Sequence, residues 1–224
     1  MHRIAVFSAS RDSVRDGIAS ADVGDRLQFW IRRDPDGAVE YAGAIHGGVF
    51  SRFDLGGPDQ ALIEVHYRIG VLLRARFGGL AARAELYHVS SHLGDEFLVD
   101  SGVRPISTSR EGLEFLLQGS PLPGITVYGG PGVLLRTSRD LDRLSLRAGA
   151  DWESSPAAHA RFYASVDLFT WAESEWEPAL ATELGAALGR GARLGLLFGL
   201  GPSRAEQFFR ESERLLGVTI SYVR

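Results

Sequence analysis

Several features that would identify a common class of protein are missing from this 224-residue sequence. It has no cysteine, which excludes a disulfide framework, a thiolate metal site and a cysteine nucleophile. It has no apolar run near the roughly 20 residues of a membrane-spanning helix, because candidates such as Leu194–Leu200 are interrupted by glycine. The 24 basic residues are spread singly among acids rather than gathered into a stripe, so we expect no nucleic-acid partner.

Apolar residues, by contrast, make up 45% of the chain, enough for the core of one large all-β domain or two small ones. No repeat array or low-complexity linker divides the sequence, so we expect a single domain over residues 1–224, with 1–22 partly irregular. The first residues have too short an apolar core for a secretory signal, and an exported protein is therefore expected here in mature or trimmed form. Residues 204–216 suit either a short helix or a loop.

Alternation of apolar and polar residues, with the period of a β-strand, is the main pattern. The clearest stretch runs from Ile63 to Leu73, where apolar residues at odd positions oppose Glu64, His66 and Arg68. Similar segments recur along the whole chain, separated by clusters of Gly, Pro and Asp. Twelve are predicted, at about 3–9, 26–32, 39–53, 63–74, 80–90, 107–117, 125–136, 143–150, 159–171, 178–188, 192–200 and 217–223.

Alternation alone fits a β-sandwich, a soluble ligand-binding barrel with its apolar faces inward, or a membrane barrel. The segments run near ten residues or more, as tilted membrane strands do, and aromatics such as Trp171 and Trp176 flank the turns like an interfacial girdle. Closure also removes unpaired edges from the hydrocarbon. We therefore predict a closed antiparallel transmembrane β-barrel of about 12 strands, with Ile63, Val65, Leu113 and Phe115 turned outward to lipid.

The segment Tyr87–Phe97 contains two histidines, two serines and two acidic residues. His88 and Ser90 continue the apolar face of their strand, so a membrane barrel sets both on its outer wall. Residues two apart on a strand share a face, and a histidine at that spacing can take the proton of a serine nucleophile. Glu111, on the same-facing neighbour strand, is the candidate third member that orients the base. The alternative is that His88 and Ser90 sit at headgroup level and hydrogen-bond the adjoining strand.

The residues that follow are expected to form a loop from Leu93 to Pro105. His92, Asp95 and Glu96 either hold the loop by ordinary hydrogen bonding, which is the favoured interpretation, or bind a hard cation such as calcium through oxygen ligands, with Asp100 as a further donor. The charged residues of the opposite strand faces are interpreted as lumen ion pairs, and His46 and His66 as members of the same polar network. They are Glu64, Arg68, Arg83 and Glu85.

The block His-Val-Ser-Ser-His-Leu-Gly-Asp-Glu at 88–96 resembles the bacterial domain-of-unknown-function family 1207, and weaker similarities at 48–54, 128–130 and 201–209 extend the resemblance over most of the chain. It implies an outer-membrane β-barrel. A more distant resemblance is to outer-membrane phospholipase A, in which a His-x-Ser pair on the outer wall is oriented by an asparagine from the next strand. This chain has no asparagine, so that role either falls to Glu111, Ser107 or Ser109 or is absent.

Two functions follow as expectations. The first is an outer-membrane barrel with a lipid-facing acyl-ester hydrolase site at His88, Ser90 and Glu111. The second is a barrel without catalysis that acts as a narrow pore, an assembly factor or a structural element. In both, membrane lipid is the expected partner, the bacterial outer membrane is the expected location, and a homodimer is compatible with the sequence.

Overall fold

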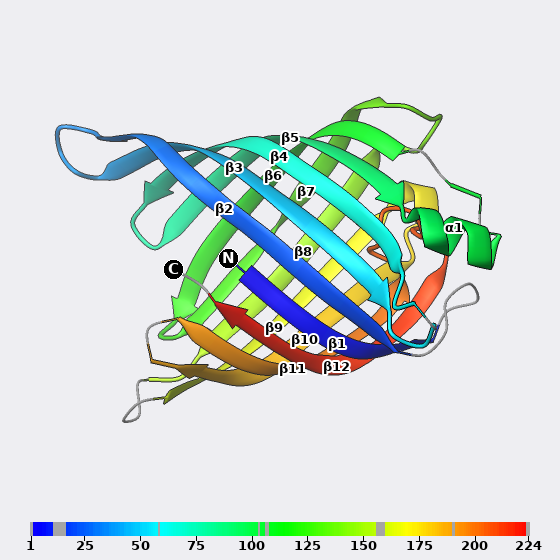
Figure 1. Ribbon diagram of the computed structural model, residues 1–224. Coiled ribbons are helices and arrows are strands. Elements are labelled where there is room, and N and C mark those ends of the chain that lie inside the picture. The colour runs from blue at the N-terminus through cyan, green and yellow to red at the C-terminus, as the bar shows by residue number, and fades with distance from the viewer. Residues whose placement is uncertain are drawn as a thin grey trace.

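The computed structural model describes residues 2–10, 17–57, 59–102, 104–105, 108–155, 160–189 and 191–222. Its strands form one closed barrel in which each strand pairs antiparallel with its sequence neighbours, and β1 pairs β12 to close the sheet (Figure 1). The strands are β1 (His2–Ser10), β2 (Ile18–Arg33), β3 (Val39–Asp54), β4 (Leu62–Phe77), β5 (Leu80–Leu93), β6 (Thr108–Leu122), β7 (Ile125–Thr137), β8 (Leu144–Glu153), β9 (Ala160–Trp171), β10 (Pro178–Leu188), β11 (Ala192–Pro202) and β12 (Ser212–Tyr222).

The predicted closed barrel of twelve strands is confirmed. The main differences are in length, because β2 is already paired with β1 at Ile18, well before the predicted segment at 26–32. Within the predicted loop 93–105 the chain forms a short helix, α1 (Asp95–Ser101), which ends at Gly102 in the left-handed conformation. No helix in the described ranges is long and apolar enough to cross a membrane.

Large apolar side chains face outward, as the alternation predicts. Exposed examples on β4 and β6 are Ile69 at 57% and Phe115 at 47%. Of the four residues predicted to face lipid, Ile63 does not, since it is fully buried in the interior with Leu93 and Phe97. The register between β3 and β4 shifts there, with Arg52 opposite Glu64 but the next residue opposite Leu62. This β-bulge turns Ile63 inward and corrects its predicted outward orientation.

The two ends of the barrel differ. Short turns join β2 to β3, β4 to β5 and β6 to β7 at the end that holds both chain termini, whereas α1 and the connection before β12 lie at the other end (Figure 1). We call the end with α1 the loop end and the end with the chain termini the short-turn end.

Residues 203–211, called the plug segment below, close the interior at the loop end. They form turns rather than the helix considered from the sequence. Phe208 is 1% exposed and packs edge-on against Phe97 of α1, with ring centroids 6.2 Å apart. Glu206 accepts a 2.6 Å hydrogen bond from Arg110 of β6, and the Gln207 side chain donates one of 2.6 Å to Ser91. Apolar packing and polar contacts thus hold the plug segment inside the barrel.

Ion pairs between side chains line the rest of the lumen. His46 Nε2 lies 3.0 Å from Glu85 Oε1, and Glu85 also pairs with Arg68 and Arg83. His66 instead stacks on Phe50 with ring centroids 4.6 Å apart. The predicted lumen ion pairs are therefore present, and they join residues of β3, β4 and β5 along the inner side of the wall.

Candidate active site on the outer wall

The candidate site lies where β5 pairs with β6. Their register sets His88 directly opposite Glu111. Leu86, two residues before His88, is 50% exposed, and Phe115 on β6 belongs to the same outward set. Because side chains alternate along a strand, His88, Ser90 and Glu111 all face outward with these apolar residues. The outer-wall position expected from the sequence is therefore the one found.

Two of the three predicted residues are in contact. His88 Nδ1 lies 3.6 Å from Glu111 Oε1, and the two side chains are 43% and 42% exposed. This distance suits an ion pair when the imidazole is protonated, and a modest rotation shortens it to a hydrogen bond. Glu111 therefore takes the place beside the histidine that the sequence assigned to it, while Ser107 lies outside the described residues.

Ser90 follows His88 on the same face and is half-buried between the strands at either side, with Tyr67 of β4 opposite it. Among the described residues, no side-chain hydrogen bond joins Ser90 to His88. Contact with Glu111 occupies the Nδ1 side of the ring, so Nε2 is the nitrogen left to accept a proton from a hydroxyl. Catalytic hydrogen bonds are often long in proteins without substrate and shorten on binding.

The site is close to the loop end of the wall. β5 ends at Leu93 and β6 begins at Thr108, so His88 and Glu111 are separated from the rim by only a few residues. Side chains near the ends of membrane strands lie closer to the lipid headgroups than those at the middle of the strands.

The acids proposed as calcium ligands do not form a fitting donor set. Asp95 and Glu96 occupy the first turn of α1, and Asp100 lies near its end; all three are exposed. In the part of the chain that the structure describes, no three His, Cys, Asp or Glu residues gather as potential metal ligands. Calcium prefers six to eight converging oxygens. The two acids at the helix start are better explained by their favourable interaction with the helix dipole.

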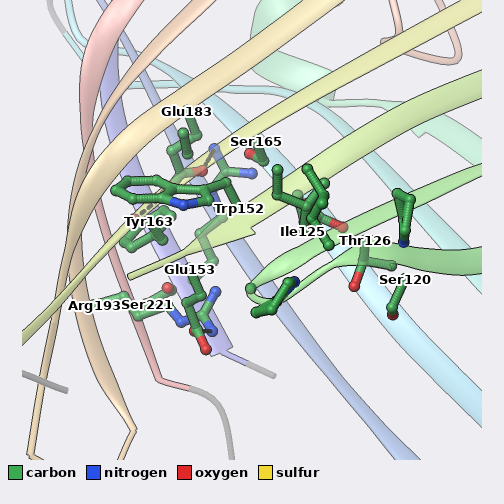
Figure 2. Close-up of a pocket in the computed structure, with 17 residues that line it drawn as sticks. Ser120, Ile125, Thr126, Trp152, Glu153, Tyr163, Ser165, Glu183, Arg193 and Ser221 are labelled. Atoms are coloured by element: carbon green, nitrogen blue, oxygen red, sulfur yellow. Dashed lines mark hydrogen bonds and ion pairs between the residues drawn. The ribbon is translucent and has the colours of Figure 1, made fainter. Parts of the chain in front are cut away.

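A separate cavity, which the sequence did not indicate, opens at the short-turn end. Its volume is about 730 Å³, and its lining includes Arg3, Glu153, Tyr163, Glu183 and Arg193 (Figure 2). Several of these groups pair with one another: Arg193 forms an ion pair with Glu153 at 2.9 Å, and the Tyr163 hydroxyl donates to Glu183 at 2.6 Å. The cavity contains none of the predicted site residues.

A barrel with an apolar outer wall, a charged lumen and unequal ends is an outer-membrane β-barrel, and the solved structures that it matches agree. It is 14% identical to the outer membrane phospholipase (OMPLA) of Salmonella typhi, solved as a dimer with bound calcium, over 99% of this chain and 90% of that one, with a TM-score of 0.71. For outer membrane phospholipase A from Escherichia coli the identity is 14%, the coverage 99% and 89%, and the TM-score 0.69. The NanC porin is 9% identical over 100% of both chains, with a TM-score of 0.59.

These likenesses concern the fold, and with the apolar wall they locate the protein in a bacterial outer membrane. The particular family is given by a sequence match over residues 3–223. The chain belongs to the family described as protein of unknown function (DUF1207). No curated protein matches it.

Proposed function

We propose that the protein is an outer-membrane acyl-ester hydrolase whose nucleophile is Ser90, whose base is His88 and whose orienting carboxylate is Glu111. The observation that carries the proposal is the 3.6 Å contact between His88 and Glu111 on the lipid-facing wall, with a serine two residues along the same face. Charged and ionisable groups on a lipid-facing wall are costly, so a histidine and a glutamate kept together there support a functional role.

The geometry supports a definite division of labour. Ser90 Oγ attacks the ester carbonyl while His88 Nε2 removes its proton, and Glu111 beside Nδ1 holds the ring and stabilises the imidazolium. The same imidazolium then gives its proton to the departing alcohol, leaving the fatty acyl group on Ser90. Water, deprotonated by His88, releases the fatty acid. The position near the rim supports this last step because water reaches that level of the membrane.

A passive pore is less consistent with the interior. The plug segment fills the loop end, with Phe208 1% exposed, and ion pairs such as Arg52–Glu213 at 3.1 Å join strands that are not neighbours, here β3 and β12, through the lumen. Narrow porins share the barrel architecture, as the NanC comparison indicates. A barrel without catalysis is therefore the second candidate function, which a negative enzyme assay would favour.

Two finer expectations concern partners. The Salmonella typhi phospholipase was solved as a dimer with calcium, and a homodimer is part of the present proposal. It predicts that the protein crosslinks to itself in detergent when substrate analogue is added. We do not propose a calcium site for this protein, because Asp95, Glu96 and Asp100 do not converge on one point. No step of the proposed reaction uses a metal.

The test is fatty-acid release from phospholipid vesicles that contain the parent protein, Ser90→Ala or His88→Ala. Thr182→Ala is the matched control, because it removes another hydroxyl from the outer wall, where Thr182 lies between the exposed Val166 and Phe198. We expect losses of at least about a hundredfold for the two site variants, the scale of removing a nucleophile or general base. The control should keep the parent rate.

Folding is checked by the heat-dependent shift of the barrel on gels, so a lost activity is not confused with a lost barrel. An alkyl fluorophosphonate should label the parent at Ser90 and leave Ser90→Ala unlabelled. Equal release by parent and variants, or no release by any, overturns the enzyme and leaves the barrel without catalysis.

A further inference from the structure

The cavity at the short-turn end contains a row of three polar side chains on the inner side of the wall. Asp151 of β8 is directly opposite Thr126 of β7 on one side and Ser165 of β9 on the other. All three residues line the cavity (Figure 2). Directly opposite residues of antiparallel strands have Cβ atoms about 4.5–5.5 Å apart. The register therefore sets one carboxylate between two hydroxyl groups.

Asp151 differs from the other acids of the cavity in having no partner. Glu153, on the same strand, forms an ion pair with Arg193 at 2.9 Å. Glu183 of β10 forms one with Arg3 at 3.3 Å. No hydrogen bond or ion pair joins the Asp151 side chain to any residue that the structure describes, and this residue is exposed. Its carboxylate is therefore available to a ligand that enters the cavity.

The two hydroxyl groups beside Asp151 are also unused. Neither the Thr126 nor the Ser165 side chain forms a hydrogen bond with another residue in the described ranges. A hydroxyl oxygen accepts hydrogen bonds through two lone pairs, and an ionised carboxylate accepts several. Three neighbouring strands thus present acceptors side by side, and only the central acceptor carries a charge.

A primary ammonium group has the chemistry that fits this row. It carries one positive charge and three N–H donors, enough for one contact to each of the three side chains. A guanidinium group instead presents paired, planar donors that suit a single carboxylate, and a quaternary ammonium group has no donor. A metal ion fits less well, because no three His, Cys, Asp or Glu residues gather as ligands in the part of the chain that the structure describes.

The cavity is large enough for an organic molecule that carries such a group. Its volume of about 730 Å³ is within the range of small-molecule sites, which is about 300–1,000 Å³. Arg193 and Glu153, which also line it, already form an ion pair with each other and leave the Asp151 carboxylate unneutralised. A cation is therefore the ligand that the charge of the cavity favours.

We propose that Asp151, Thr126 and Ser165 form a binding site for the primary ammonium group of a small polar organic molecule. Asp151 supplies the opposite charge, and the two hydroxyl groups select a nitrogen that still carries its hydrogens. The site is separate from the proposed hydrolase, since it lies in the lumen and includes neither His88 nor Ser90. It gives the barrel a second activity, which is the capture of a solute at the short-turn end.

The test is isothermal titration calorimetry of the parent protein in detergent micelles with three probes of similar length. They are 4-amino-1-butanol, its N-trimethyl derivative and 1,4-butanediol. The first probe has the charge and the N–H donors, the second has only the charge, and the third has neither. We expect saturable binding of the amino alcohol, binding of the trimethyl compound weaker by about tenfold, and no binding of the diol.

Asp151→Asn should weaken binding of the amino alcohol by about tenfold or more, because it removes the charged acceptor and keeps the size of the side chain. Asp22→Asn is the matched control. Asp22 lines a different cavity of the lumen and forms no ion pair with a described residue. The control should bind as the parent does. Equal weakening in both variants would mean that the lumen attracts cations in general, and it would overturn the site.

The double variant Ser165→Ala/Thr126→Val keeps the test decisive if Asp151→Asn does not fold. It retains the charge and removes both hydroxyl groups, so the preference for the amino alcohol over the trimethyl compound should fall by about threefold or more. An unchanged preference in the folded double variant overturns the role of the hydroxyl groups in the site. None of the probes contains an ester. Absence of saturable binding to the parent, or equal binding of the trimethyl compound, therefore overturns the inference whether or not the protein hydrolyses lipid.

Discussion

Arg110 and Glu111 are consecutive in β6 but act on opposite sides of the barrel wall. The Arg110 guanidinium donates to Glu206 of the plug segment inside, whereas the Glu111 carboxylate lies against His88 outside. The alternation of a strand therefore divides one dipeptide between the closure of the lumen and the candidate site.

This division predicts separable effects. Glu111→Gln should lower kcat by about a hundredfold or more with little change in KM or in thermal unfolding, because the carboxylate orients the base without binding lipid. Arg110→Gln should leave kcat close to the parent value. Fatty-acid release and unfolding are measured on both variants. Loss of kcat in Arg110→Gln alone would contradict the assignment.

Arg110→Gln should instead destabilise the barrel by about 3 kcal/mol, because it leaves the nearly buried Glu206 carboxylate without its partner. The double variant Arg110→Met/Glu206→Met removes both charges and should recover much of that loss. Urea unfolding in vesicles measures the free energies of the parent, Arg110→Gln, the single variants Arg110→Met and Glu206→Met, and the double variant. A double variant as unstable as the sum of its single variants would show that the two residues do not interact.

Removal of the plug segment should open the lumen. Replacing residues 204–210 with a short Gly-Ser linker takes Phe208 out of the interior cluster and frees Arg110. In planar bilayers, the parent should give no stable conductance, and the shortened protein should give discrete channels. Phe208→Ala offers a milder comparison, with an expected cost of about 3 kcal/mol from the cavity. Equal conductance in parent and shortened protein would indicate that closure lies elsewhere.

Interlocking of tyrosine and glycine across strands should contribute to stability. Tyr87 of β5 is opposite Gly112 of β6, and a Cβ on Gly112 would overlap the Tyr87 ring and hydroxyl. Gly112→Ala should therefore cost about 1–3 kcal/mol from overpacking. Gly79→Ala is the control, because nothing lies within 4 Å of a Cβ there. Adding Tyr87→Ala to Gly112→Ala should relieve the clash but not restore full stability.

The sequence predicted the barrel because a period of two residues is a direct consequence of strand geometry. The same parity correctly sets His88 and Ser90 outward and predicts Glu111 as their neighbour. Parity fails where a bulge adds a residue, and this explains both the inward Ile63 and the outward Arg136. In each instance two adjacent apolar residues, Leu62–Ile63 and Leu134–Leu135, interrupt the alternation and mark the bulge in retrospect.

The plug segment could not be assigned because its contacts join residues far apart in the chain. Arg110 and Glu206 are separated by 96 positions, and neither sits in a local pattern that indicates the other. The outward position of Arg136 is equally inaccessible to sequence reasoning, since Arg136 would point into the lumen without the extra residue Leu135 of β7. Whether the site hydrolyses lipid stays a prediction that awaits the assay.

The plug segment lies at the loop end of the barrel, and this affects which side solutes can reach the interior from. The cavity beside Arg193 and Glu153 opens at the short-turn end, while Phe208 and Phe97 close the opposite end. Because outer-membrane barrels turn their short turns to the periplasm, we predict that a small polar solute enters this cavity from the periplasmic side and leaves through the same opening. The proposed site lies on the outer wall, so hydrolysis of lipid there does not require the lumen to open.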